Sequence, residues 1–254
     1  MAVKEQELIP VAPPEIEDVQ LKNETLLFKA KIDVVPEVKI KSYRGLKVIK
    51  KKIKLEQDQV DQALDRLRQQ KKPVPELNEQ FAQGLGFKTV QELQEAVRKD
   101  LQANAQMQVQ RDTESQLIQQ LLQRTSLDIP ESLVNNQTEE ALRQLKINAI
   151  LRGEKKEQVE AKESQLREQA KNEAIQRVRL SFVLDKIAEL ESVQVEENEL
   201  QVRIAEISQR LGKSEDETRA YLDKENLMPG LEAELKNRKT IQLLLTEANV
   251  VEEK

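Results

Sequence analysis

The feature that most constrains this chain is a long stretch without helix breakers, from Pro130 to about Leu190. It contains no further proline and a single glycine, Gly153. Proline breaks helices when it lies inside them but suits the first helical turn, where Glu131 beside it also favours a helix start. Apolar residues then follow on one stripe: Leu133, Val134, Ala141, Leu145 and Ala149. The sequence therefore predicts a helix that begins near Pro130 and runs to the Arg152-Gly153-Glu154 segment.

A second apolar stripe follows the glycine. Its members recur four residues apart: Leu166, Ala170, Ala174, Val178 and Phe182. That spacing places all five side chains on one face of a helix. Two long helices joined by a tight turn at Gly153 form an antiparallel arm. The rest of the chain is then expected to supply the body from which this arm projects.

The composition fits long helices with one buried stripe better than a compact globule. Of the 254 residues, 38% are hydrophobic and 34% are charged, whereas aromatic residues make up only 2%. Any core must therefore be aliphatic, and the regular spacing of Leu, Ile and Val argues against disorder. The net charge is −5, with 41 basic residues dispersed among 46 acidic ones. This distribution argues against a nucleic-acid-binding surface.

The residue types that are missing exclude several classes of function. The chain has no cysteine and no histidine, so it lacks disulfides, thiolate metal sites and the usual carrier of acid–base chemistry near neutral pH. No apolar run approaches the roughly 20 residues of a membrane-spanning helix, and residues 1–7 lack the apolar segment of a signal peptide. We therefore expect no catalytic residues, metal, cofactor or membrane partner, and a cytoplasmic location.

Residues 1–54 carry strand patterns. Alternation of Phe28, Ala30, Ile32 and Val34 with polar residues is typical of a strand, and residues 16–21 are placed to form a hairpin with it. Alternation returns at 38–41 and at 48–55, where lysines separate apolar residues. Such lysines commonly guard an exposed strand edge, which we favour over a nucleic-acid patch. We expect a partial N-terminal β segment and linker over 1–54 and a helical domain over 55–254.

Helix signals dominate the remainder of the chain. Thr89 with Glu92, and Ser214 with Glu217, have the spacing of capping boxes. A proline-rich linker at 71–75 separates the first two helical segments. Apart from the arm, the predicted helices are residues 55–70, 76–87, 90–124, 196–211, 214–226 and 231–249.

Several segments, taken in order, resemble the bacterial trigger factor. They are Val35-Pro36-Glu37-Val38-Lys39-Ile40, Tyr43-Arg44-Gly45-Leu46, Asp128-Ile129-Pro130-Glu131-Ser132-Leu133-Val134, and residues 61–70, 74–77 and 196–200. The resemblance covers essentially the whole chain through order and spacing rather than one specific motif. It implies a mainly α fold of the trigger factor C-terminal and SurA-like type. Such a fold is an elongated helical body with two protruding arms, here with a small antiparallel β segment near the N-terminus.

Two parts of that family have no counterpart here. The family docks on the ribosome through a Gly-Phe-Arg-Arg/Lys-Gly-Lys loop, which does not occur in this sequence. A prolyl isomerase domain would be inserted where Gln70 runs into Lys71-Lys72-Pro73. Tyr43 and Tyr221 are too few aromatic residues beside phenylalanine to line its proline pocket. The resemblance thus leaves isomerase activity and ribosome docking without a basis. Family members often form homodimers through the N-terminal part, and the sequence leaves open whether the short form is natural or engineered.

What remains implied is an ATP-independent holdase chaperone. It would bind unfolded or nascent polypeptides through dispersed apolar surface between its arms. By position and similarity, the predicted client-binding residues are Leu145, Ile147, Ile150, Leu151, Ile207, Leu211, Tyr221 and Met228. Each could instead pack inside an arm, and Ile147 and Ile150, which lie off the main stripe, are the better candidates for exposed surface. A helical adaptor that binds one folded partner is the alternative function, and an enzyme that uses paired carboxylates is the third hypothesis.

Overall fold

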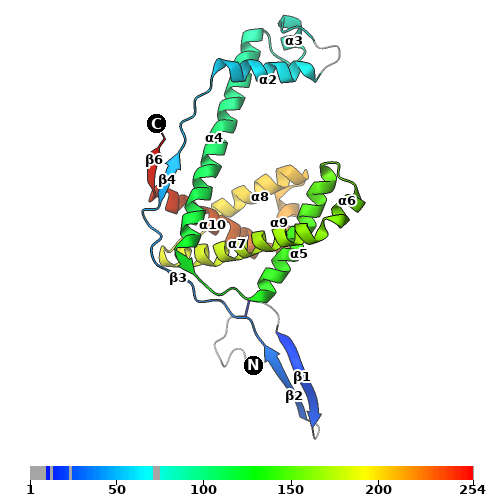
Figure 1. The fold of residues 1–254 in the computed structure, drawn as a ribbon, viewed down its shortest axis with the longest axis vertical. Helices are drawn as coiled ribbons and strands as arrows, with labels where there is room; N and C mark the ends of the chain where they lie inside the picture. Colours follow the sequence, from blue (N-terminus) through cyan, green and yellow to red (C-terminus); the bar gives the residue numbers. More distant parts are fainter. Residues whose placement is uncertain (1–9, 12–13, 23–24, 71–74, 254) are drawn as a thin grey trace. The chain divides into compact units, whose positions relative to one another are not determined.

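The computed structural model describes residues 10–11, 14–22, 25–70 and 75–253 (Figure 1). The chain divides into two compact units. Unit 1 comprises Met1–Tyr43 and Leu121–Leu244, and unit 2 comprises Arg44–Gln120 and Leu245–Lys254. The expected mainly α-helical fold, with arm-forming helices and a small antiparallel β segment, is confirmed. The division at residue 54 stays a prediction.

Unit 1 holds two small sheets and most of the helices. β1 (Glu15–Lys22) and β2 (Thr25–Lys31) form the predicted antiparallel hairpin, whose turn residues 23–24 lie outside the described part. β3 (Lys39–Ile40) pairs with β5 (Thr125–Ser126). The helices are α5 (Glu131–Leu151), α6 (Lys156–Ala161), α7 (Glu163–Leu190), α8 (Glu197–Leu211), α9 (Glu215–Lys224) and most of α10 (Met228–Thr246).

The first arm is built from α5 and α7, which lie side by side (Figure 1). Ala141 and Leu142 of α5 are buried with Ala170 of α7, and Leu145 and Leu166 pack against them. Small alanines on the stripe let the two helices approach closely. The predicted stripes therefore face each other.

The turn between the arm helices contains an additional short helix. Gly153 has a φ of +92°, and the amides of Gly153 and Glu154 donate to the carbonyls of Ile150 and Ala149 at 2.9 and 3.1 Å. This is a Schellman motif, which needs the left-handed conformation that glycine adopts without strain. The expectation of one tight turn is incomplete, because α6 follows the glycine. Its Val159 is buried, which fixes the short helix in place.

The second group of helices in unit 1 is α8, α9 and α10. Their aliphatic cluster contains Leu200, Ile204, Leu222, Leu231 and Leu235. Gly212 ends α8 with a φ of +64°, and Ser214 caps α9 by accepting from the Glu217 amide, as predicted. The last helix begins at Met228, three residues earlier than expected. Pro229 lies in its first turn, where a missing amide donor costs nothing.

Unit 2 contains α2 (Gln57–Gln69), α3 (Glu79–Gln83) and most of α4 (Val90–Gln123). Its core cluster is Val60, Leu64, Phe81, Ala82 and Leu93. The α3 helix is shorter than the predicted 76–87. It starts only after Asn78, whose side chain accepts from the Phe81 amide, and the chain turns at Gly86 with a φ of +90°. Residues 71–74 of the predicted linker lie outside the described part.

A two-stranded parallel sheet in unit 2 was not predicted. β4 (Lys47–Lys50) pairs with β6 (Asn249–Glu252), whose first residue is the expected end of the last helix. The other edge of β4 is met by glutamine side chains of α4. Gln116 accepts from the Ile49 amide at 2.9 Å and donates to its carbonyl at 3.0 Å, and Gln120 donates to the Lys47 carbonyl at 2.5 Å. These side chains occupy the place of a third strand. The strand ends at Lys50, where its pairing with β6 ends, instead of continuing to residue 55.

Candidate functional site

Three apolar side chains stand exposed at the C-terminal end of α5. Ile147 is 44% exposed, Ile150 is 49% exposed and Leu151 is 79% exposed. Ala149, on the same turn, is buried. The helix therefore turns its alanine stripe inward and leaves these larger residues outward. We call Ile147, Ile150 and Leu151 the α5 tip.

The fourth predicted residue of this arm, Leu145, is placed differently. It is partly buried and packs on the cluster of Ala141, Leu142 and Ala170. Its i, i+4 relation to Ala141 and Ala149 puts it on the helix stripe that faces α7. Neighbouring side chains within the arm therefore cover most of the Leu145 side chain.

The four residues predicted on the later helices divide in the same way. Leu211 is 53% exposed and Tyr221 is 47% exposed, with the Lys213 ammonium 5.6 Å from the centre of the tyrosine ring. Ile207 and Met228 are partly buried against the cluster that contains Leu200. Leu211 ends α8 beside the turn at Gly212, whereas Tyr221 lies in the last turn of α9.

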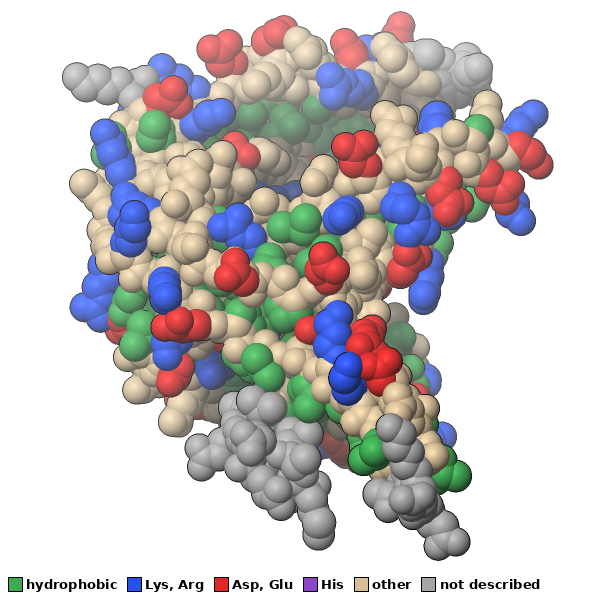
Figure 2. Space-filling view, turned by 60° about the horizontal axis from the view of Figure 1, so that its bottom comes forward, with side chains coloured by type: hydrophobic (Ala, Val, Ile, Leu, Met, Phe, Trp, Pro, Cys, Tyr) green, Lys and Arg blue, Asp and Glu red, His purple; other side chains and the backbone are tan. Residues whose placement is uncertain are grey.

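Within residues 131–244 of unit 1, sequence reasoning missed three further exposed large apolar residues: Leu190, Val202 and Leu227. Val202 lies off the stripe of Leu200 and Ile204, and this departure from the helical period was the available signal. Leu190 and Leu227 sit at helix ends, where burial depends on the direction that the chain takes next. Figure 2 shows apolar side chains exposed between acidic and basic ones on the face that it displays.

Ion pairs tie α7 to α5, and one more spans α6 from the residues on either side of it. Lys146 Nζ lies 2.6 Å from Glu163 Oε2, Lys162 Nζ lies 2.9 Å from Glu154 Oε2, and Arg167 pairs with Glu139. The hydrogen bond and the charge of Lys146 lower the pKa of Glu163. These pairs are exposed or half exposed, and each contributes little to stability. Their geometric effect is to hold the helix ends in register around the tip.

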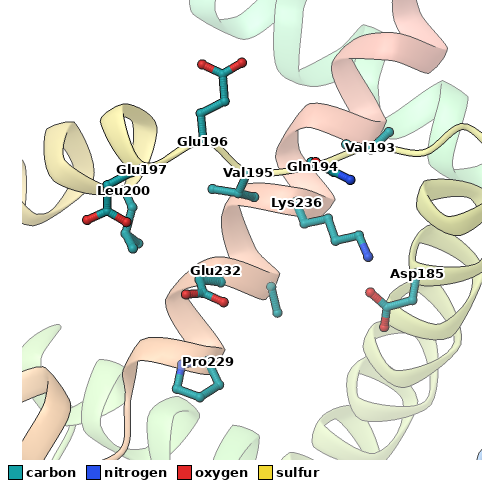
Figure 3. Close-up of a pocket in the computed structure, with 11 residues that line it drawn as sticks. Asp185, Val193, Gln194, Val195, Glu196, Glu197, Leu200, Pro229, Glu232 and Lys236 are labelled. Carbon is teal, nitrogen blue, oxygen red and sulfur yellow. The ribbon is translucent and has the colours of Figure 1, made fainter.

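A polar pocket of about 540 Å³ lies in unit 1, where α7, α8, α10 and the segment 193–196 meet (Figure 3). Asp185, Glu196, Glu197 and Glu232 contribute carboxylates, and Lys236 contributes a positive charge. Desolvation raises the pKa of Asp185, an effect that Lys236 and a hydrogen bond with Ser181 partly offset. Figure 3 shows the Lys236 side chain extending toward Asp185. The pocket is suited to hold a basic side chain weakly, and it contains no nucleophile paired with a base.

Unit 2 has a more apolar pocket of about 440 Å³ between α2, the segment after α3, and α4. Leu67, Phe87, Val97 and Leu101 line it, with Arg66 among the polar residues. These apolar residues also pack against the core cluster of unit 2. The pocket is therefore a shallow extension of that core.

Two classes of site are not found in the part of the chain that the structure describes. No group of three or more His, Cys, Asp or Glu residues there could hold a metal ion. Among the same residues, no helix is long and apolar enough to cross a membrane.

Comparisons with known proteins agree on one family. The family model for the bacterial trigger factor C-terminus matches residues 89–246, and the model described as bacterial trigger factor protein matches residues 1–67. Residues 68–88 lie between the two matches.

Curated relatives and a solved structure lead to the same family. The trigger factor of Pelobacter propionicus is 29% identical over 187 residues, which cover 72% of this chain and 42% of that protein. The trigger factor of Nostoc punctiforme is 28% identical over a stretch that covers 70% of this chain and 37% of that protein. A solved structure from work on promiscuous substrate recognition by the trigger factor chaperone superimposes with a TM-score of 0.55 at 15% identity, covering 97% of this chain and 82% of that one. The chain thus spans about two fifths of the length of the curated relatives it matches.

Proposed function

This chain belongs to the bacterial trigger factor family, and from this premise we propose that it is an ATP-independent holdase chaperone. It binds unfolded or nascent polypeptides through dispersed apolar side chains on its helical arms. The observation that carries the proposal is the α5 tip. There, three large aliphatic residues at one helix end are 44–79% exposed, although the same helix buries Ala141, Leu142 and Ala149.

The chemistry of the surface suits a holdase. Complete burial of a Leu or Ile side chain contributes about 1.5–3 kcal/mol, so partial cover of two or three such residues gives modest affinity. Leu211, at the end of α8, and Tyr221, in the last turn of α9, supply a second set of contacts. Contacts of this kind do not demand one client sequence, and weak binding permits rapid release.

Neither isomerase activity nor ribosome docking forms part of the proposal. Only residues 68–88 separate the two family matches, too few for a further folded domain of ordinary size. We therefore expect this protein not to accelerate the refolding of a substrate whose folding is limited by prolyl isomerisation.

The proposal is tested by suppression of aggregation of several unrelated denatured proteins, without ATP. In a triple variant, Ile147→Ser, Ile150→Ser and Leu151→Ser, we expect the concentration for half-maximal protection to rise about tenfold, the effect of losing about 1.4 kcal/mol of binding. Leu190→Ser is the matched control, because Leu190 is also about half exposed but lies at the opposite end of α7 from the tip. It should protect like the unaltered chain.

Two outcomes would overturn the proposal. Protection of a single client only would favour the adaptor alternative. Equal loss in the triple variant and the Leu190→Ser control would show that the α5 tip has no special role. Methyl NMR identifies the residues that bind an unfolded client. When the client is added, the methyl chemical shifts of Ile147 and Ile150 should change, whereas those of buried Ile204 should not.

A further inference from the structure

The parallel sheet of unit 2 is completed on one edge and open on the other. In this sheet, β4 lies between α4 and β6 (Figure 1). Side chains of Gln116 and Gln120 bond to the backbone of β4 on its side toward α4. In the part of the chain that the structure describes, no strand pairs with the outer edge of β6, and all four of its residues are exposed. The fold thus completes the β4 edge and leaves the β6 edge uncovered.

The hydrogen bonds of β6 show which of its backbone groups face the open edge. In a parallel pair, alternate residues of a strand direct their amide and carbonyl groups to the same neighbour. The amides of Asn249 and Glu253 donate to carbonyls on the β4 side, at 2.8 and 3.0 Å. Val250 and Glu252 have the opposite parity, so their amides and carbonyls are directed away from β4. Among the described residues, none makes a hydrogen bond to these outward groups.

Both faces of β6 offer apolar contacts beside the open edge. Val250 is 45% exposed, and it lines a pocket of about 540 Å³ with Leu245 and with Val109 of α4. On the opposite face, Val251 is 40% exposed and lies beside its register partner Ile49, which is also exposed. Successive side chains of a strand alternate between the two faces. A strand added to this edge would therefore make apolar contacts whichever of its alternate residues are apolar.

The sequence of β6 does not protect the edge in the usual way. Exposed edges are commonly guarded by lysine or proline, which discourage pairing with another chain. β6 is Asn-Val-Val-Glu and contains neither residue, whereas both lysines of the sheet lie in β4. β-Branched valines also favour the extended conformation. The edge is therefore suited to accept a further strand.

We propose that the outer edge of β6 binds an extended segment of an unfolded polypeptide, which adds to the sheet as a third strand. The backbone of the segment bonds to the outward groups of Val250 and Glu252, and its side chains contact the apolar surface on both faces. This inference rests on the proposed function, since it gives the same clients a second binding site and a second mode of binding.

Backbone recognition suits the clients of a holdase. Amide and carbonyl groups are common to every polypeptide, so a strand can add to this edge with little demand on its sequence. A folded protein has already paired these groups within its own structure. The edge therefore distinguishes unfolded chains from folded ones, which exposed apolar side chains alone do less sharply.

Amide hydrogen exchange read by NMR tests this geometry. The probe is a synthetic peptide of about ten residues in which lysine and valine alternate. When the peptide is bound, the amides of Val250 and Glu252 should exchange about tenfold more slowly. The Val251 amide already faces β4 and should change little. The same peptide with every backbone amide methylated should protect neither residue, because it has no donor for the edge.

Two substitutions at one position separate the backbone of β6 from its side chain. Val250→Pro removes an outward amide but no bond to β4, a place where edge strands accept proline. It should raise the dissociation constant of the peptide about tenfold. Val250→Thr is the matched control, since it keeps the amide and the branched shape, and it should bind the peptide like the unaltered chain. The amide of Val48, the register partner of Val250, should keep its protection in both variants.

The results distinguish this site from the proposed function. The triple variant of the α5 tip should bind the peptide with unchanged affinity although it suppresses aggregation less well. The inference is overturned if the peptide protects neither Val250 nor Glu252, or if the proline and threonine variants bind it equally, even when the unaltered chain suppresses aggregation. Protection that rises with the concentration of the chain alone would also overturn it, and would assign the edge to a second copy. Protection by the peptide without any suppression of aggregation would refute the holdase proposal alone.

Discussion

At the scale of single residues, chain reversals in unit 1 depend on left-handed positions that close helix ends. Gly153, Ser192 and Asn226 each have positive φ, at 92°, 53° and 53°. In each case the following amide donates back to a carbonyl five residues earlier, as Val193 does to Ala188 at 2.8 Å. The same motif ends α5, α7 and α9, and also α8 at Gly212, where φ is 64° and the Lys213 amide donates to the Ser208 carbonyl at 3.1 Å. At the two glycines the left-handed conformation carries no strain, whereas at Ser192 and Asn226 it does.

Gly153→Ala is expected to lower the free energy of unfolding by about 1–2 kcal/mol, the cost of a left-handed conformation for a residue with a Cβ. A new methyl group would meet no atom within 4 Å, so conformation alone sets the effect. Urea unfolding followed by circular dichroism measures it.

Gly230→Ala provides the contrast for this prediction. Gly230 lies in α10, its added Cβ also meets open space, and its φ is not positive. Alanine should therefore stabilise the chain by about 0.5–1 kcal/mol. A destabilisation of the same size in both variants would contradict the assignment of the Gly153 effect to its φ.

At the scale of elements, local patterns predicted helices well and the partners of strands poorly. The apolar period and the capping boxes at Thr89 and Ser214 are properties of neighbouring residues, so the sequence alone located α4 and α9. The pairing of β4 with β6 joins segments about two hundred residues apart, and no local pattern encodes it. Burial within an arm was predictable where the stripe was regular, as at Leu145. Exposure at helix ends, as at Leu190 and Leu227, was not.

The glutamines that complete the β4 edge give a prediction for one element. Gln116→Ala removes both hydrogen bonds to Ile49. The Ile49 amide should then exchange its hydrogen faster, and unit 2 should lose about 1 kcal/mol of stability. Hydrogen exchange read by NMR checks this. Gln119→Ala is the control, since Gln119 is an exposed residue of the same helix. Unchanged exchange at Ile49 in the Gln116 variant would show that the side-chain amide does not replace a strand.

At the scale of the whole molecule, the chain has separate aliphatic cores instead of one. The cluster around Leu64 lies in unit 2, and the cluster around Leu200 lies in unit 1. Few aromatic residues are available, so each core rests on many small contacts. The two cores are built from segments that lie far apart in the sequence. One core can therefore unfold locally without disrupting the other.

Substitutions in the two cores should therefore act locally. Leu64 is 1% exposed, and Leu64→Ala should cost about 2–5 kcal/mol through lost burial and the cavity left behind. Faster hydrogen exchange is expected at Val60 and Leu93 of unit 2, while the amide of Ile204 in unit 1 keeps its protection. Leu200→Ala should produce the reverse pattern. A uniform loss of hydrogen-exchange protection across both units in either variant would show that the two clusters unfold as one cooperative unit. Packing in unit 2 would then also affect the apolar α5 tip in unit 1.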